Sequence, residues 1–432
     1  MSQQIRRVAI LGGNRIPFAR SNGAYLGVSN QEMLAAAIQG LVDRYKLKGE
    51  RLGEVAGGAV MKHSRDFNLV REAVLDTTLD PHTPAYDVQQ ACGTGLEAAI
   101  LVANKIALGQ IDSAIAGGVD TTSDAPIGLN DQLRRQLMVI NSQKTNQDKA
   151  KKALGLLSVN WFKPDIPKNG EPRTGLAMGD HAAITAKEWN VPRQAQDELA
   201  MNSHVNLGKA YAEGWQKDLI TPFKGLDKDN NLRPDSKMEK LATLKPVFGG
   251  PDGTMTAGNS TPLTDGASAV LLGSEEWAAK RGLKVLAYFR DAETAAVDFT
   301  GRNGYKEGLL MAPAYAVPRM LARNGLSLQD FDYYEIHEAF ASQVLATLAA
   351  WESDKFCREK LGLDKALGSI DRSKLNVKGS SLAAGHPFAA TGGRIIPVLG
   401  KLLAQSEGGT GRGVISICAA GGQGVVAILE RA

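Results

Sequence analysis

One cysteine at the end of a short extended segment has a setting that favours chemistry. In PAYDVQQACGTGLEAAI, which spans residues 84–100, Tyr86 and Val88 alternate as in a strand, and small or apolar residues recur at helical spacing from Leu96 onward. Cys92 therefore lies where a strand gives way to a helix. Free backbone N–H groups and the positive end of the helix dipole gather there, and both favour a thiolate. We interpret Cys92 as a candidate nucleophile; a buried, inert thiol is the alternative.

A cysteine nucleophile needs a base, and two of the six histidines stand in similar connections. His386 lies in the glycine-rich segment SSLAAGHPFAATGG, directly before a proline. His337 lies in YYEIHEAFASQ, where a strand pattern changes into a helical one. A hydrogen-bonded structural histidine is the alternative for each. We assign the other four histidines to that structural role: His63, His82, His181 and His204.

A second cysteine ends another strand pattern near the C-terminus. In ICAAGGQG, Cys418 precedes a glycine-rich turn whose small residues permit close approach and whose N–H groups can receive an oxyanion. A glycine-rich hairpin with one buried thiol is the alternative. No Ser/His/Asp set, carboxylate pair or phosphate-binding loop stands out in the same way, and no cysteine stands in a metal-ligand pair. We therefore expect no metal.

These candidates must be held by an α/β alternation that occupies both ends of the chain. The strands that we expect are, in chain order, 8–11, 54–60, 85–89, 113–117, 284–289, 333–336, 376–378, 414–418 and 425–429. The helices that we expect are 31–44, a helix after Cys92, 179–189, 192–213, 313–324, 340–351 and 392–403. Such alternation predicts a mostly parallel sheet covered by helices. Since the two outer portions share this layout, we predict an internal duplication.

A polar and basic insertion separates the two α/β halves. It begins near Ser123, where prolines, lysines and arginines accumulate around two short apolar clusters. One interpretation is an element that binds a membrane surface or a partner; the other is a solvated helical pair packed on the main body. The predicted domains are an N-terminal half at 1–123 with 258–275, an inserted domain at 124–257 and a C-terminal half at 276–432.

Composition excludes several classes of protein. The chain has 432 residues, more than one ordinary core accommodates, and its 43% hydrophobic and 22% charged residues are typical of soluble globular proteins. A net charge of +4 suits an anionic ligand but falls well short of a nucleic-acid-binding signature. Three scattered cysteines indicate a reducing compartment, which we take to be the cytoplasm. No cleavable signal is evident, and no apolar run reaches the roughly 20 residues that cross a bilayer.

Taken in order, the motifs resemble those of the thiolases, which make and cleave the carbon–carbon bond of 3-ketoacyl-CoA thioesters. The resemblance covers essentially the whole chain. The matching motifs are RIPF at 15–18, the Cys92 block, Gly117-Gly118, Met178-Gly179, GTMTAGNSTPLTDG at 253–266, HEAFA at 337–341, Gly385-His386-Pro387 and the Cys418 block. The resemblance implies the α/β thiolase fold: two duplicated βαβαβαββ halves with parallel and mixed sheets, layered α-β-α-β-α, and an inserted loop domain that binds CoA.

Two positions indicate which branch of the thiolases the chain resembles most. Many thiolases carry asparagine where this chain has His337, and the histidine form is similar to the branch of fatty-acid β-oxidation, including the β-subunits of trifunctional complexes. Ala177 stands where biosynthetic acetoacetyl-CoA thiolases often have histidine, so that function is the second interpretation. A ketosynthase is disfavoured because it would lack the second cysteine, Cys418. A non-catalytic thiolase-like binding protein would be expected to lose Cys92, His386 or Cys418.

The resemblance also implies a ping-pong reaction and the roles of five residues. Cys92 would be the nucleophile that carries the acyl group, and His386 its base and an oxyanion ligand. Cys418 would act as acid and base. His337 would hold the thioester oxygen, and the backbone N–H of Ala420 would complete an oxyanion hole.

CoA is implied as a substrate, with no permanently bound cofactor. Met178, Ser260 and Thr261 would lie near its pantetheine arm. Thiolases generally form dimers or dimers of dimers, so we expect a homo-oligomer. The resemblance is also compatible with a hydratase/dehydrogenase partner subunit and with peripheral membrane contact.

Overall fold

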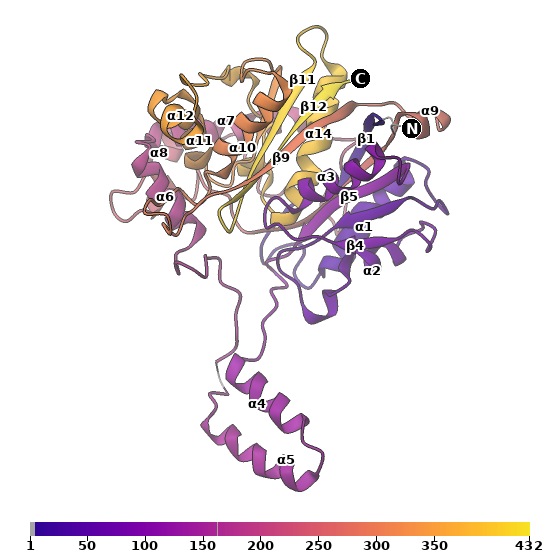
Figure 1. Ribbon diagram of the computed structural model, residues 1–432, viewed down its shortest axis with the longest axis vertical. Helices are drawn as coiled ribbons and strands as arrows, with labels where there is room; N and C mark the ends of the chain where they lie inside the picture. Colours follow the sequence, from indigo (N-terminus) through magenta and orange to yellow (C-terminus); the bar gives the residue numbers. More distant parts are fainter. Residues whose placement is uncertain (1–4, 162) are drawn as a thin grey trace.

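A single mixed sheet runs through both halves of the protein. The computed structural model describes residues 5–161 and 163–432 (Figure 1). The strands of this sheet are β1 (Val8–Arg15), β2 (Ala19–Arg20), β3 (Glu54–Gly57), β4 (Ala85–Asp87), β5 (Ser113–Asp120), β8 (Thr264–Ser274), β9 (Ala287–Ala296), β10 (Tyr333–Ile336), β11 (Arg412–Ala419) and β12 (Gln423–Arg431). Their order is β10-β11-β12-β9-β1-β8-β5-β3-β4, with β2 on β8, while β6 (Pro246–Phe248) and β7 (Met255–Thr256) form a separate pair.

The two halves repeat one topology, as the duplication predicted. In the N-terminal half β3 is parallel to β4 and β5, whereas β8 is antiparallel to β5 and β1. In the C-terminal half β10 is parallel to β11 and to a bridge at Leu375, whereas β12 is antiparallel to β11 and β9. A three-residue antiparallel pairing of β1 with β9 joins the halves into one sheet.

The prediction of a strand at 376–378 is wrong. Only one bridge, between Tyr334 and Leu375, remains there. Asn376 adopts φ 48°, and its side-chain amide bonds both the N–H and the C=O of Ile336, at 3.0 and 2.9 Å. A side chain therefore replaces the backbone ladder at this edge of the sheet.

Helices cover both faces of each half, in the order of layers that the resemblance implied. The helices are α1 (Asn30–Arg44), α2 (Leu69–Leu75), α3 (Thr94–Ala107), α4 (Asp131–Asn141), α5 (Asn146–Ala153), α6 (Met178–Glu188), α7 (Arg193–Ala212), α8 (Met238–Ala242), α9 (Glu275–Lys280), α10 (Ala312–Asn324), α11 (Ala341–Glu352), α12 (Asp354–Leu361), α13 (Ser381–Ala384) and α14 (Thr391–Gln405). The apolar side chains of α3 and α14 pack against strands of both halves. The helices α1 and α2 cover the outer face of one half, and α10 and α11 that of the other.

Glycines let the first turns of α3 and α14 meet at the centre of the molecule. A Cβ atom on Gly392 would lie 2.1 Å from the backbone nitrogen of Leu96, and one on Gly95 would lie 2.6 Å from the carbonyl oxygen of Ala389. Any larger residue would separate the two helix starts. Cys92 lies two residues before the start of α3 and His386 five residues before the start of α14, so the same glycines help bring the two side chains together.

The insertion divides into a packed part and a projecting part. Helices α6 and α7 pack on the C-terminal half. Helices α4 and α5 instead form an arm that extends away from both halves (Figure 1). Only Leu133 is buried in α4, and no residue of α5 is buried. The interpretation of this pair as packed on the main body is therefore wrong. None of the helices within residues 5–161 and 163–432 is long and apolar enough to cross a membrane.

Candidate active site

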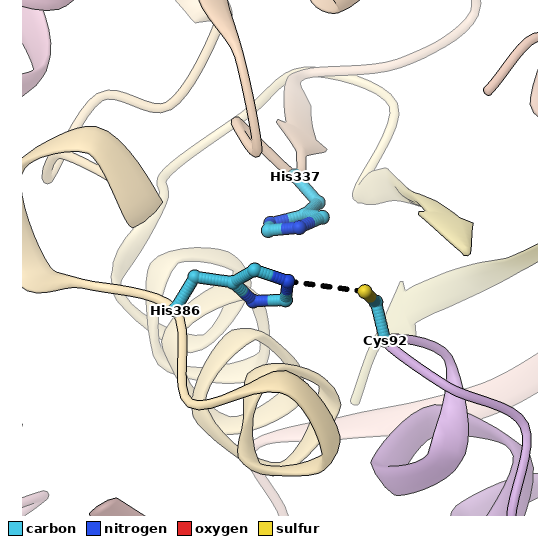
Figure 2. Close-up of side chains that lie close together, drawn as sticks. All are labelled: Cys92, His337 and His386. Atoms are coloured by element: carbon cyan, nitrogen blue, oxygen red, sulfur yellow. Dashed lines mark hydrogen bonds between the residues drawn. The ribbon is translucent and has the colours of Figure 1, made fainter. Parts of the chain in front are cut away.

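A cysteine and two histidines from distant parts of the sequence face one another between the two halves (Figure 2). Cys92 lies between β4 and α3, and the preceding residue, Ala91, adopts the left-handed φ of 46°. The Sγ of Cys92 is 3.1 Å from Nε2 of His386. His337 follows the end of β10, and its ring centroid lies 4.1 Å from that of His386. The structure thus brings together three of the predicted side chains.

The expectation that a helix start lowers the thiol pKa is wrong for the protein at rest. Although the Cys92 side chain is partly exposed, desolvation by the surrounding protein raises its pKa to about 12. The backbone N–H groups of Ala420 and Cys92 lower that pKa by less than desolvation raises it. Burial, followed by the charge of Arg394, lowers the pKa of His386 to about 3. The resting pair is therefore a neutral thiol hydrogen-bonded to a neutral imidazole, and the proton must cross as the sulfur attacks.

Hydrogen bonds fix the orientation of both imidazole rings. The Nδ1 atom of His386 lies 2.6 Å from Oγ1 of Thr391, which leaves Nε2 directed at the thiol. The Nδ1 atom of His337 lies 2.7 Å from Oγ of Ser381. Nε2 of His337 is buried without a hydrogen-bond partner. Burial, then the electrostatic interactions with His386 and Arg394, hold the pKa of His337 well below its ordinary value.

The second cysteine, Cys418, belongs to the C-terminal half and interacts with Cys92 of the N-terminal half. Cys418 is buried in β11, and burial, then interaction with Cys92, raises the pKa of its thiol above the usual range. The turn after it places the N–H of Ala420 at the Cys92 sulfur. The next residue, Gly421, donates its N–H to Oε1 of Glu171 at 2.6 Å, which anchors this turn to the insertion. A thiol, a base, backbone donors and a second thiol therefore converge.

The three residues expected near CoA pack on or bond the segment that follows His337. Met178 packs against the apolar cluster that contains Phe340 and Cys418. Ser260 forms a bridge with Phe340, and its buried Oγ has no hydrogen-bond partner. Thr261 is already engaged, because its N–H and Oγ1 both donate to the carbonyl of Ala339, at 3.1 and 3.0 Å.

Several residues around the site were not predicted from the sequence. The buried carboxylate of Asp120 accepts hydrogen bonds from the N–H groups of Val60, Met61 and Ala389, and it thereby ties β5 to the His386 segment. Burial raises the pKa of Asp120 to about 7. Asp120 ends β5 two residues after the Gly117-Gly118 pair, which was the only available clue. The turn expected at Gly117-Gly118 is wrong, because both glycines pair with β8 inside the strand. Glu171, Ser381 and Arg394 were missed because their partners lie 13 to 250 positions away in sequence, and Thr391 was missed although its partner, His386, is only five positions away.

The other histidines lie in structural settings, as assigned. The Nε2 of His181 bonds Thr174, Nδ1 of His204 accepts from the N–H of Arg233, Nε2 of His63 bonds the carbonyl of Asp124, and His82 is exposed beside Asp80. The ligand atoms of Cys92, His337 and His386 lie within 4.8 Å of one another and are the set in the described residues that could hold a metal ion. The thiol–imidazole hydrogen bond already uses two of these atoms.

Comparisons with known proteins agree along the whole chain. Residues 8–276 match the family described as "Thiolase, N-terminal domain", and residues 283–431 match "Thiolase, C-terminal domain". The chain is 40% identical over 436 residues to the 3-ketoacyl-CoA thiolases of Yersinia enterocolitica and Yersinia pestis, covering 100% of this chain and 98% of each relative.

Solved structures show the same similarity. The acetyl-CoA acetyltransferase of Bacillus anthracis superposes with a TM-score of 0.80 at 30% identity and covers 100% of both chains. The human mitochondrial 3-ketoacyl-CoA thiolase superposes with a TM-score of 0.80 at 26% identity, covering 99% of this chain and 100% of that one. The latter has also been solved in complex with CoA, again with a TM-score of 0.80 at 26% identity and 99% coverage of each chain.

Proposed function

This chain belongs to the thiolase family, and from that premise we propose that it is a 3-ketoacyl-CoA thiolase of fatty-acid β-oxidation. The enzyme is an acyltransferase that cleaves a 3-ketoacyl-CoA with free CoA into acetyl-CoA and an acyl-CoA two carbons shorter, and the reverse reaction is a Claisen condensation. The single observation that carries the proposal is the 3.1 Å contact of Cys92 Sγ with His386 Nε2, made where the Ala420 N–H also reaches the sulfur.

In the first half of the reaction, the Cys92 thiol attacks the 3-keto carbon. His386 takes the thiol proton at Nε2, and the new C–S bond turns the carbonyl oxygen into an oxyanion. The backbone N–H groups of Cys92 and Ala420 stabilise this oxyanion. When the carbonyl re-forms, the bond between carbons 2 and 3 breaks, and its electron pair leaves as the enolate of acetyl-CoA.

The second half of the reaction needs the other thiol. Cys418 protonates the enolate carbon and becomes a thiolate, while Nε2–H groups of His337 and of protonated His386 hold the enolate oxygen. After acetyl-CoA leaves, the Cys418 thiolate deprotonates incoming CoA. The CoA thiolate attacks the acyl group on Cys92, and the departing Cys92 sulfur recovers its proton from His386. All protons are thereby returned to their starting atoms.

CoA acts as a substrate in this proposal and is not retained as a cofactor. The inserted domain at 124–257 would bind it, with the N-terminal half at 1–123 and 258–275 and the C-terminal half at 276–432 on either side. Met178, Ser260 and Thr261 would line the pantetheine arm; the free, buried Oγ of Ser260 supports this role, because a ligand amide would satisfy it.

A second candidate function is that of an acetoacetyl-CoA thiolase, which the similarity to the Bacillus anthracis acetyl-CoA acetyltransferase favours. The decisive experiment is an assay of CoA-dependent cleavage across 3-ketoacyl chain lengths. We expect cleavage of substrates longer than acetoacetyl-CoA. Activity confined to acetoacetyl-CoA would transfer the enzyme to the second function, and failure to cleave any 3-ketoacyl-CoA would remove both.

We further propose that the arm touches an anionic membrane surface. The arm includes the short 3₁₀ helix Leu154–Ser158, which directly follows α5. Its exposed apolar residues include Met138 at 63%, Leu154 at 67% and Leu157 at 87% exposed, and its basic residues include Lys151 and Lys152. We expect Leu154→Asp with Leu157→Asp to weaken sedimentation with anionic lipid vesicles and to leave thiolysis unchanged, since the arm lies away from the catalytic cluster.

The matched control for the arm is Leu26→Asp, because Leu26 is 64% exposed on the N-terminal half. This variant should sediment with vesicles like the unaltered protein. Equal sedimentation of the double variant, or no sedimentation of the unaltered protein, would contradict the membrane contact. In the second case, co-purification with a hydratase/dehydrogenase subunit would identify a protein partner.

We also propose that the protein forms a homo-oligomer. The strand β4 ends the strand order, and its outer edge has no partner strand within the described chain, so a second copy can pair there. Light scattering should give a multiple of the 46.0 kDa chain mass, as expected for a dimer or a dimer of dimers. The free state of Cys92, Cys357 and Cys418 supports a reducing, cytoplasmic location, which cell fractionation would test.

A further inference from the structure

The hydrogen bonds behind His337 assign positioning roles to two residues outside the reacting cluster. We propose that Arg394 and Ser381 hold His337 in the tautomer with its proton on Nε2, so that this ring always offers a donor to the substrate. The catalytic meaning of this assignment rests on the proposed thiolase function. The assignment of the tautomer itself does not, because it follows from contacts within the protein.

The three residues form a buried chain of hydrogen bonds. Arg394, on α14, donates from Nη2 to Oγ of Ser381 at 2.9 Å. The same Oγ lies 2.7 Å from Nδ1 of His337. The exposed fractions are 4% for Arg394, 0% for Ser381 and 1% for His337, so water does not compete for these atoms.

Arg394 determines which atom donates and which accepts in each of these hydrogen bonds. A guanidinium can only donate, so one lone pair of the Ser381 oxygen is always occupied by Arg394. The hydroxyl hydrogen of Ser381 then needs an acceptor, and among the described residues its only candidate is Nδ1 of His337. If Nδ1 carried the proton instead, two donors would meet at one oxygen and a buried hydroxyl hydrogen would have no partner. Nδ1 therefore accepts, and the single ring proton resides on Nε2.

A second proton on His337 is disfavoured by its surroundings. Burial opposes the imidazolium form, and the charges of Arg394 and of a protonated His386 oppose it further. Glu335 interacts electrostatically with Arg394 but is buried with both carboxylate oxygens unpartnered, and burial raises its pKa to about 8. The carboxyl of Glu338 instead accepts from Ser203, Asn376 and the N–H of Leu382. Neither carboxyl group is therefore hydrogen-bonded to the Ser381 hydroxyl.

The hydrogen bonds of the two histidines consequently give their Nε2 atoms opposite roles: that of His386 accepts a proton, and that of His337 donates a hydrogen bond. His386 directs Nε2 at the thiol of Cys92 and must keep a lone pair there to act as a base, with Nδ1–H donating to Thr391. His337 presents a buried Nε2–H that no protein group accepts within the described chain. An unpaired donor in that position is the group that a developing enolate oxygen requires.

Histidine NMR tests the tautomer without any assay of activity. Protein labelled with ¹⁵N at its six histidines should show, near neutral pH, a protonated Nε2 and an unprotonated Nδ1 for His337, with the signal assigned by its loss in His337→Asn. In Ser381→Ala the proton should redistribute toward Nδ1. A proton on Nδ1 in the unaltered protein would overturn the proposal.

A double-mutant comparison tests the catalytic consequence. Ser381→Ala should lower kcat roughly 10-fold with KM nearly unchanged, since it loosens a donor whose complete loss costs about 10²–10³ in kcat. In a His337→Asn background the same change should alter kcat by less than about 2-fold, because an amide N–H donates without tautomers. Equal losses in both backgrounds would overturn the positioning role.

The control is the neighbouring buried serine. Ser380 also accepts from Nη2 of Arg394, at 3.1 Å, but Nδ1 of His337 is hydrogen-bonded to Ser381 instead. We expect Ser380→Ala to leave both the His337 tautomer and the dependence on the His337→Asn background unchanged. If Ser380→Ala reproduced the tautomer shift, the relay through Ser381 would be wrong. If the unaltered protein showed the expected tautomer but cleaved no 3-ketoacyl-CoA, the proposed function alone would fail.

Discussion

Replacing Cys92 by alanine is expected to lower the rate of thiolysis by at least about 10⁴-fold, the loss typical of removing a catalytic nucleophile. The acyl group has no other acceptor in the reaction as we derive it, because the neighbouring thiol of Cys418 is needed as the acid. The measurement is the disappearance of 3-ketoacyl-CoA in the presence of free CoA. Substrate binding should survive, since the change removes a single sulfur atom.

The control for this loss is Cys357→Ala. Cys357 is buried, and its Sγ contacts the carbonyl oxygens of Ala350 and Trp351 at 3.6 Å, among residues outside the catalytic cluster. Its replacement should affect stability more than turnover. An alanine variant at position 92 that kept more than a few per cent of the rate would show that Cys92 does not carry the acyl group.

Replacing Cys418 by alanine is expected to separate the two chemical steps. General acid–base groups contribute about 10²–10⁴ to rate, so thiolysis should fall by that factor. Transfer of an acyl group from acetyl-CoA to Cys92 should persist at a reduced rate, because it forms no carbanion and CoA can leave as a thiolate. Deuterium exchange at the acetyl carbon in heavy water should disappear, because that exchange requires Cys418 to move protons to and from carbon.

The conservative variant Cys418→Ser sharpens this prediction. A serine hydroxyl fills nearly the same buried space next to Cys92 but is a much weaker acid, so the exchange should remain lost while acylation persists. Loss of acylation together with exchange would assign Cys418 a structural role. Unchanged exchange in either variant would transfer the acid role to another group.

The sequence predicted the parts of the site that depend on local chain geometry. Cys92 and His337 each stand at a strand-to-helix connection, as predicted, whereas His386 lies in the connection between the helices α13 and α14. The structure brings these three connections together. The duplication was also visible, as an alternation of strands and helices at both ends of the chain. These features follow from periodicity and from glycine placement, which are encoded within short windows.

Features that depend on distant neighbours were missed or wrong. The helix start suggested a low pKa for Cys92, but enclosure by both halves adds a desolvation cost that no local window contains. The strand at 376–378 failed because the Asn376 side chain bonds a residue forty positions away. The contact of Ser381 with Arg394 and His337 has no local pattern, because a serine and an arginine in helices are ordinary surface residues until the fold buries them.

The sequence also did not predict that the arm projects from the two halves. Its alternating apolar and basic residues are compatible with packing on the body or with exposure, and only the position of α4 and α5 beyond both halves decides between them.

The central claim is that catalysis passes through an acyl group on Cys92. The most direct test is to mix the protein with a 3-ketoacyl-CoA in the absence of free CoA, quench with acid and analyse the peptides by mass spectrometry. We predict that the peptide containing Cys92 gains the mass of an acyl group two carbons shorter than the substrate. An unmodified Cys92 peptide, or the acyl group on Cys418 instead, would contradict the account.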